Sequence, residues 1–329
     1  MRTVLVLLAL VGFCYGQTKL GKYNLESDIS VSGLSSGSYM ANQFHIAQSK
    51  RVIGAGLFAG GPYYCAQGSM ITATNACMKL PTSITVSTLQ SKAQSYANSL
   101  LLDPLSNLAR SKVYIFSGTR DSVVVPGVVK KQEEFYAPYV TGPGAIKTVY
   151  DIAAEHGMPT DFYGGSCGLT NLDYINNCNY NGAYEALNHI HGGLQKPSSG
   201  AALTGQLILF DQSEFFKLAA PSTYGMDTAG YIYVPAACQG GAKCRLHIVF
   251  HGCLQAREKL GDKYARYTGY NQVADLNNFI ILYPQAKSNM SNPNGCWDWW
   301  GFSSTAYANK NGYQMTGVER MMLRTLGLY

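Results

Sequence analysis

Short apolar runs alternate with longer amphipathic stretches through the first half of the chain. The runs at 28–32, 51–59 and 112–116 have the length and composition of strands, whereas 36–49 and 86–101 have the residue spacing of helices. Strands that alternate with helices predict an α/β domain with a mostly parallel central sheet and helices on both faces. The same reading predicts a helix over 128–139 and strands over 147–153, 206–210, 231–234, 246–250 and 279–283.

The rest of the chain fits one domain over 17–329. Residues 161–200 are rich in Gly, Asn and Cys around one short predicted helix at 182–190, and we interpret this segment as a lid-like insertion. Near the C-terminus, apolar residues recur at helical spacing and predict an amphipathic helix over 317–326. No internal repeat or Pro-rich linker divides the chain.

The N-terminus has the pattern of a secretory signal. Arg2 precedes the apolar run 4–13, which Cys14, Tyr15 and Gly16 follow as a small-x-small cleavage site. We therefore expect a signal peptide over 1–16 and a secreted, extracellular protein. The apolar run is too short to span a membrane. Charged residues make up 13% of the chain and the net charge of +6 includes no long basic run, which argues against a nucleic-acid partner.

Eight of the nine cysteines lie beyond the predicted signal peptide, and an even number in a secreted protein favours four disulfides. Eight cysteines allow 105 pairings. Pairing of neighbours along the chain, with the last pair by elimination, suggests Cys65–Cys77, Cys167–Cys178, Cys238–Cys244 and Cys253–Cys296. No CxxC motif occurs and the six His do not have ligand spacing from the Cys, so no metal is expected. Asn289 begins an N-x-S sequon and is a glycosylation candidate.

Ser35 lies at the centre of a GxSxG motif formed by residues 33–37. The predicted strand 28–32 leads into the motif and the predicted helix 36–49 follows it, which is the strand-turn-helix context of a serine nucleophile. Ser35 is then expected at the carboxyl edge of the sheet, where open α/β sheets bind ligands.

Two further residues follow predicted strands and complete the chemistry. Asp121 comes after the strand at 112–116, and His156 comes after the strand at 147–153. The order Ser, Asp, His is that of the α/β-hydrolase fold. We predict Ser35 as nucleophile, His156 as base and Asp121 as the carboxylate that orients the base. Alternatives remain among the other ionisable residues: His191 is the best alternative base, ahead of His45, His189 and His247, and Asp103 and Asp161 are alternative acids.

Acyl transfer also needs two backbone N–H donors for the developing oxyanion. The residue after the nucleophile, Ser36, supplies one, and Cys253 in the HG-type loop 251–255 is predicted to supply the other. This loop usually precedes the nucleophile in such folds, yet here it follows Ser35. We therefore expect a circular permutation in which the C-terminal helix lies beside the strand before Ser35. That arrangement requires chain ends within about 20 Å of each other.

The chain resembles the extracellular polyhydroxybutyrate (PHB) depolymerase family, specifically its circularly permuted single-domain type, in the segments GLSSGSYMANQFH, GTRDSVVVP, AEHGMPTD, FDQSEF, GYIYVPAAC, LHIVFHGCLQ, LYPQA and CWDWWGF. The resemblance implies a serine esterase of α/β-hydrolase fold that hydrolyses polyesters of short-side-chain 3-hydroxy acids without a metal or organic cofactor. It implies the same roles for Ser35, Asp121, His156, Ser36 and Cys253. No separate substrate-binding domain is evident, and we expect a monomer.

The segment CWDWWGF also offers a substrate surface. A Cys253–Cys296 disulfide would tie Trp297, Trp299 and Trp300 to the oxyanion loop, where their rings could contact an ester chain, although one or more of them could be core residues. Three other functions remain open. They are a secreted carboxylesterase acting on small or plant-derived esters, a catalytically silent binding protein of the same fold, and a secreted protease.

Overall fold

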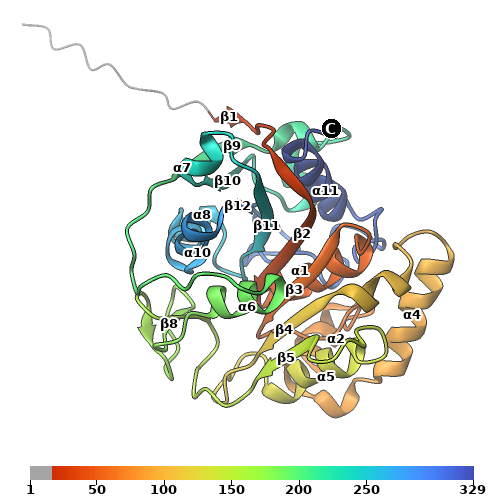
Figure 1. Ribbon diagram of the computed structural model, residues 1–329. Helices are drawn as coiled ribbons and strands as arrows, with labels where there is room; N and C mark the ends of the chain where they lie inside the picture. Colours follow the sequence, from red (N-terminus) through yellow and green to blue (C-terminus); the bar gives the residue numbers. More distant parts are fainter. Residues whose placement is uncertain (1–16) are drawn as a thin grey trace, which may run out of the picture.

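The computed structural model describes residues 17–329, so the expected signal peptide and Cys14 lie outside the described residues. Nine strands form one sheet (Figure 1), in the spatial order β1 (Thr18–Lys19), β9 (Gln206–Asp211), β10 (Ala229–Val234), β12 (Phe279–Tyr283), β11 (Cys244–Phe250), β2 (Leu25–Leu34), β3 (Val52–Phe58), β4 (Lys112–Phe116) and β5 (Ile146–Val149). Strand β10 runs antiparallel to both of its neighbours, and the remaining pairs are parallel. The expected mostly parallel sheet is confirmed.

Side chains alternate between two apolar cores, as the two-residue repeat of a strand requires. In β4, Val113 and Ile115 face one core, while Tyr114 and Phe116 face the other. Both faces of these strands are buried, which explains why they read as continuous apolar runs in the sequence.

Helices cover the two faces of the sheet. The first core contains buried side chains of α1 (Ser36–Ala47), α4 (Val86–Asn98), α5 (Pro126–Tyr136) and α11 (Tyr313–Thr325). The second contains side chains of α6 (Gly182–His191), α9 (Lys263–Tyr267) and α10 (Tyr270–Asn277). Shorter helices are α2 (Met70–Thr74), α3 (Ala76–Lys79), α7 (Ala236–Gln239) and α8 (Arg257–Leu260). In the described part of the chain, no helix is long and apolar enough to cross a membrane.

The two ends of the described chain meet, as the permutation requires. The backbone N–H of Tyr23, just before β2, donates to the carbonyl of Thr325 at the end of α11, over 2.9 Å. Figure 1 shows α11 beside β2. Strand β2, which leads to Ser35, also pairs with β11, which leads to the loop 251–255. The fold is therefore an α/β-hydrolase fold in circularly permuted form.

Residues 161–200 differ in part from the expected insertion. Helix α6 packs on β3 and β4 as a member of the second helical layer, with Ala183, Ala186 and Leu187 fully buried. The preceding residues contribute β7 (Gly165–Ser166) and β8 (Ile175–Asn177) to a small sheet with β6 (Met158–Thr160). The role of the segment that contains β7 and β8 as a lid remains a prediction. Strand β5 also ends at Val149, earlier than expected, because residues 150–155 form an irregular segment that leads to His156.

All four predicted disulfides are present. Three of them close short loops, and the fourth, Cys253–Cys296, spans 43 residues and joins the loop after β11 to the Trp-containing segment. The three short-range pairs are Cys65–Cys77, Cys167–Cys178 and Cys238–Cys244.

Candidate active site

Ser35 occupies a strained turn between β2 and α1. Its backbone has φ 57° and ψ −121°, a conformation that side-chain-bearing residues rarely adopt. The turn is tight because glycines flank it: a Cβ on Gly33 would lie 2.1 Å from the carbonyl oxygen of Gly37, and one on Gly37 would lie 2.2 Å from that of Phe250. The Ser35 N–H donates to the Phe58 carbonyl over 2.9 Å, which fixes the turn to β3. This geometry presents the Ser35 side chain at the carboxyl edge of the sheet.

Asp121 and His156 form a buried pair. His156 Nδ1 lies 2.8 Å from Asp121 Oδ2, and the two residues are 4% and 5% exposed. Asp121 Oδ1 accepts hydrogen bonds from the N–H groups of Val123 and Val124 over 2.9 and 2.8 Å. With both oxygens engaged, the carboxylate is held in one orientation and in turn orients the imidazole through Nδ1. That leaves Nε2 as the ring atom available to Ser35.

Hydrogen bonds join the loop after β4 to the loop after β5. The N–H groups of Thr119 and Arg120 donate to the carbonyls of Ile152 and Ala154 over 2.8 and 3.1 Å. Gly118 permits this contact, because a Cβ there would lie 2.1 Å from the Ala154 carbonyl oxygen. Backbone hydrogen bonds therefore align the two loops in addition to the contact between their side chains.

Glu155 adds a contact that the sequence reasoning missed. Its carboxylate accepts the N–H of Ser122 over 3.0 Å and also the Ser122 hydroxyl. Two consecutive residues of one loop, Glu155 and His156, thus hold two consecutive residues of the other, Ser122 and Asp121. The position of Glu155 in the sequence AEHG, directly before the predicted base, could have indicated that this carboxylate takes part in the site.

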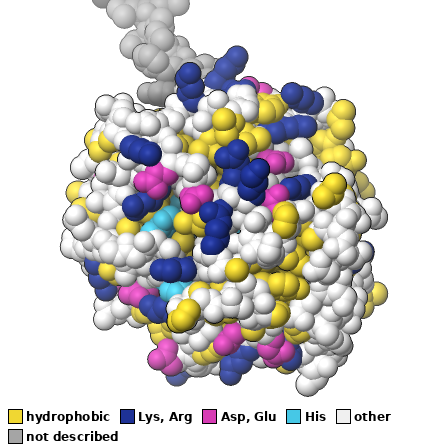
Figure 2. Space-filling model, turned by 45° about the vertical axis from the view of Figure 1, so that its right-hand side comes forward, with side chains coloured by type: hydrophobic (Ala, Val, Ile, Leu, Met, Phe, Trp, Pro, Cys, Tyr) yellow, Lys and Arg dark blue, Asp and Glu magenta, His cyan; other side chains and the backbone are white. Residues whose placement is uncertain are grey.

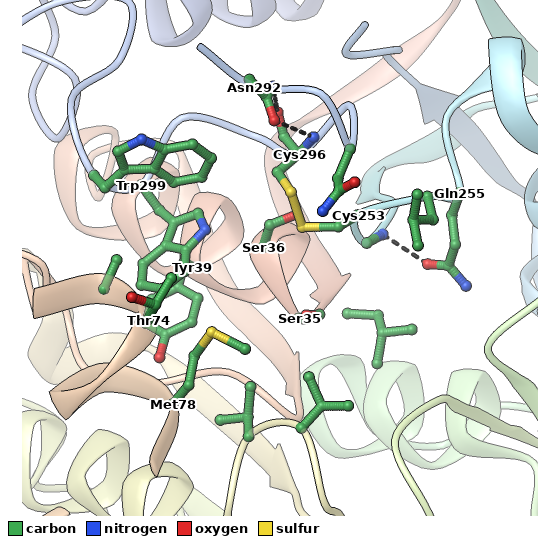
Figure 3. Close-up of a pocket in the computed structure, with 18 of the residues that line it drawn as sticks. Ser35, Ser36, Tyr39, Thr74, Met78, Cys253, Gln255, Asn292, Cys296 and Trp299 are labelled. Carbon is green, nitrogen blue, oxygen red and sulfur yellow. Dashed lines mark hydrogen bonds between the residues drawn. A yellow bond between two sulfur atoms is a disulfide. The ribbon is translucent and has the colours of Figure 1, made fainter. Parts of the chain in front are cut away.

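The two residues predicted to supply the oxyanion donors both lie at the cavity that holds Ser35. Ser36 is the first residue of α1, so its N–H has no acceptor within the helix. Cys253 also lines the cavity with Ser35, and its disulfide with Cys296 lies close to Ser36 in Figure 3. Leu254 has φ 62°, and its N–H donates to the Asn294 carbonyl over 2.8 Å. The arrangement suits an oxyanion hole.

Ser35 and His156 open into one cavity of about 270 Å³. Its described lining includes no Lys, Arg, Asp or Glu. The side chains of Ser35 and His156 share this cavity. In the described part of the chain, no hydrogen bond joins these two side chains. Such contacts often tighten only when substrate binds. Apolar walls come from α2, α3 and the segment after β12: Met70, Ala73, Met78, Pro293, Trp299 and Trp300.

The three tryptophans divide between core and cavity. Trp299 and Trp300 line the cavity, and the Trp299 ring stacks on Tyr39 with centroids 4.1 Å apart (Figure 3). Trp297 does not line it: its side chain is 0% exposed and packs edge-on against Phe250. The prediction that Trp297 contacts substrate is therefore wrong, because its ring packs against Phe250 and His251 inside the first core.

The alternative bases and acids lie elsewhere. His191 and His247 both hydrogen-bond Ser30 within β2, and His45 contacts Tyr136 and Ser111. Burial lowers the pKa of His45 and of His191 to about 3.

The remaining candidates also have other partners. Half-buried His189 contacts the Ala145 carbonyl, Asp103 pairs with Lys310, and Asp161 contacts Asn181. None of these residues lines the cavity. Within 17–329, no group of three His, Cys, Asp or Glu residues is placed to hold a metal.

Known proteins of similar sequence are PHB depolymerases, although no protein-family model matches the chain. A poly(3-hydroxybutyrate) depolymerase of Delftia acidovorans is 45% identical over 304 residues, which are 91% of this chain and 60% of that relative. The chain thus spans about three fifths of its length. A polyhydroxybutyrate depolymerase of Talaromyces funiculosus is 39% identical over 331 residues, with 95% of this chain and 94% of that relative covered.

Solved structures show the same likeness. The crystal structure of PHB depolymerase from Penicillium funiculosum has a TM-score of 0.86 at 35% identity, with 95% of this chain and 100% of that chain covered. A serine-to-alanine variant of PHB depolymerase in complex with an R3HB trimer has a TM-score of 0.87 at the same identity and coverage. The likeness in sequence extends over nearly the whole of the Talaromyces relative, and the likeness in structure over the whole of both solved chains. The chain therefore belongs to the polyhydroxybutyrate depolymerase family.

Proposed function

We propose that this protein is a secreted serine esterase that hydrolyses the ester bonds of poly(3-hydroxybutyrate) or a similar short-side-chain polyester. One observation carries the proposal: a strained Ser35 shares a cavity with the buried Asp121–His156 pair, whose Nδ1–Oδ2 distance is 2.8 Å. Family membership supplies the substrate class, because the relatives are named for this polyester and one structural neighbour holds an R3HB trimer.

The proposed reaction has two steps. His156 Nε2 takes the proton of Ser35 Oγ as that oxygen attacks the ester carbonyl carbon, and the N–H groups of Ser36 and Cys253 bind the resulting oxyanion. The C–O bond to the alcohol then breaks, and His156 returns the proton to the leaving oxygen. In the second step His156 takes a proton from water, the hydroxyl attacks the acyl-enzyme, and the acid leaves as Ser35 regains its proton. Asp121 stabilises the imidazolium in both steps.

The cavity lining fits an uncharged ester chain. A polyester carries no charge along its length, and the described lining has no Lys, Arg, Asp or Glu. The stacked Trp299 and Tyr39 provide a flat apolar wall. On the face that Figure 2 shows, Lys and Arg side chains lie close to Asp and Glu side chains. This mixed surface suits a neutral polymer better than an acidic one.

Four disulfides support secretion, since disulfides persist in oxidising compartments. We expect the secreted protein to act as a monomer, because the cavity is built from one chain, and gel filtration checks this expectation.

The test combines a particle-clearing assay with a soluble ester. Wild type should clear a suspension of poly(3-hydroxybutyrate) particles and hydrolyse p-nitrophenyl butyrate, and Ser35→Ala should lower both rates at least about 10³-fold. Ser91→Ala, on the exposed face of α4, is the matched control and should keep both activities. An organophosphonate should label wild type but not Ser35→Ala.

Three results would contradict the proposal. Turnover by Ser35→Ala near the wild-type rate would show that Ser35 is not the nucleophile. Hydrolysis of the soluble ester without particle clearing would indicate a carboxylesterase. Absence of both hydrolysis and labelling in folded wild type would indicate a silent binding protein.

A further inference from the structure

We propose that Gln255 is a positioning residue, which keeps the oxyanion loop 251–255 aligned with His156. The proposal rests on the proposed esterase function and deepens it. Gln255 is 1% exposed and lies two residues beyond Cys253, the proposed oxyanion donor. Its side-chain amide makes three hydrogen bonds to backbone groups of two separate loops.

On one side, Gln255 holds the oxyanion loop. Its Oε1 accepts the N–H of Gly252 over 2.7 Å (Figure 3). The residue at 252 must be small for this contact, because a Cβ on Gly252 would lie 2.7 Å from that same Oε1. Gly252 directly precedes Cys253, so the side chain of Gln255 limits how the backbone of the proposed donor can turn.

On the other side, Gln255 holds the segment that contacts His156. Its Nε2 donates to the carbonyls of Asp173 and Tyr174 over 2.8 and 3.1 Å. The Tyr174 carbonyl also accepts the N–H of Met158, two residues after His156, over 2.9 Å. The Tyr174 ring meets the His156 imidazole edge-on, with centroids 5.9 Å apart. A continuous chain of contacts therefore runs from the oxyanion loop through Gln255 to the base.

This link joins two strained backbone segments. Leu254 and Tyr174 have φ 62° and 49°, in the left-handed region that non-glycine residues avoid. Such conformations persist when surrounding contacts over-determine them. Further anchors of the oxyanion loop lie in segment 286–296: the Cys253–Cys296 disulfide, the Leu254–Asn294 hydrogen bond, and the hydrogen bond from the Ala286 N–H to the His251 ring. Gln255 is the anchor on the His156 side.

The test compares two buried glutamines. Gln212 is 0% exposed and its amide also bonds three backbone groups, but it lies between the ends of β9 and β12, away from the cavity. Gln255→Met and Gln212→Met remove the same kinds of hydrogen bond at similar volume. Both variants should lose thermal stability. Only Gln255→Met should lower kcat for p-nitrophenyl butyrate, by about 10- to 100-fold, which is less than the loss of an oxyanion donor.

Three further measurements separate positioning from folding. KM should stay within about threefold of wild type, and the rate at which an organophosphonate labels Ser35 should fall in parallel with kcat. Gln255→Glu, which keeps an acceptor for Gly252 but as a carboxylate cannot donate to Asp173 and Tyr174, should also lower kcat, and it serves as the second variant if Gln255→Met does not fold. Equal kcat for Gln255→Met and Gln212→Met, or wild-type kcat in Gln255→Glu, would overturn the proposal. Activity of wild type and Gln212→Met tests the esterase function separately.

Discussion

Buried neutral histidines should make this protein lose stability as the pH falls below about 6.5. Burial lowers the pKa of His45 and of His191 to about 3 and that of His251 to about 4. The two ring nitrogens of His45 contact the hydroxyls of Tyr136 and Ser111, and no carboxylate is among these partners. Protonation in the folded state would therefore place an uncompensated charge in the core.

The sign and size follow from proton linkage. Unfolded histidine has a pKa near 6.5, so below that value the unfolded state binds protons that the folded state refuses, and acid favours unfolding. Between pH 6.5 and 5.0 this amounts to about 1.6 kcal/mol for each histidine, and to at most about 5 kcal/mol for the three. Whole domains are stable by only about 5–15 kcal/mol. Burial raises the pKa of Asp298, which acts in the opposite direction.

The assay is urea unfolding at pH 7.5, 6.5, 5.5 and 5.0 with the disulfides intact, followed by tryptophan fluorescence. The wild-type free energy of unfolding should fall with pH, and His45→Gln should reduce that slope by about 1.1 kcal/mol per pH unit between pH 6.5 and 5.0. His189→Gln, at a half-buried site, is the control and should change the slope less. A flat wild-type profile from pH 6.5 to 5.0, or an unchanged slope in His45→Gln, would refute the reasoning.

Two more predictions follow from the site. Gly37→Ala should lower the free energy of unfolding by about 3 kcal/mol, because the new Cβ would lie 2.2 Å from the Phe250 carbonyl oxygen. Chemical unfolding measures this change. A loss below about 0.5 kcal/mol would contradict the close packing of α1 on β11. Glu155→Gln should lower kcat for p-nitrophenyl butyrate about 10-fold with KM unchanged, because the loop that carries Asp121 loses its charged acceptor at Ser122. Steady-state kinetics test this, with Glu134→Gln at an exposed position of α5 as the control. Equal kcat in both variants would count against the prediction.

Local patterns gave much of the fold. Strands β4 and β12 were predicted with their observed bounds, because buried parallel strands read as apolar runs between turn residues. The helices α2 and α3, which line the cavity, were not predicted, since 5 and 4 residues are too few to show a helical repeat. The role of α6 as a layer of the main domain was also missed. A Gly- and Asn-rich neighbourhood does not reveal which sheet a short helix covers.

The site, like the fold, could be predicted from the sequence only in part. The closeness of Ser35, Asp121 and His156 could be predicted because each follows a strand, and the carboxyl ends of parallel strands meet at one edge of a sheet. Their catalytic roles stay a prediction. The core position of Trp297 could not, since three tryptophans within four residues have the same chemistry and only packing distinguishes the buried ring from those that line the cavity.

The sequence by itself determined the order of the motifs and which of them follow strands, because both depend on neighbours along the chain. It suggested four cysteine pairs, and the tertiary structure selected these from the possible pairings. Only the tertiary structure decided the cavity without charged lining residues, the stack of Trp299 on Tyr39, and the amide of Gln255 between two loops. The Gln255–Tyr174 and Tyr39–Trp299 contacts join residues 81 and 260 positions apart, and side-chain packing rather than local propensity sets such contacts.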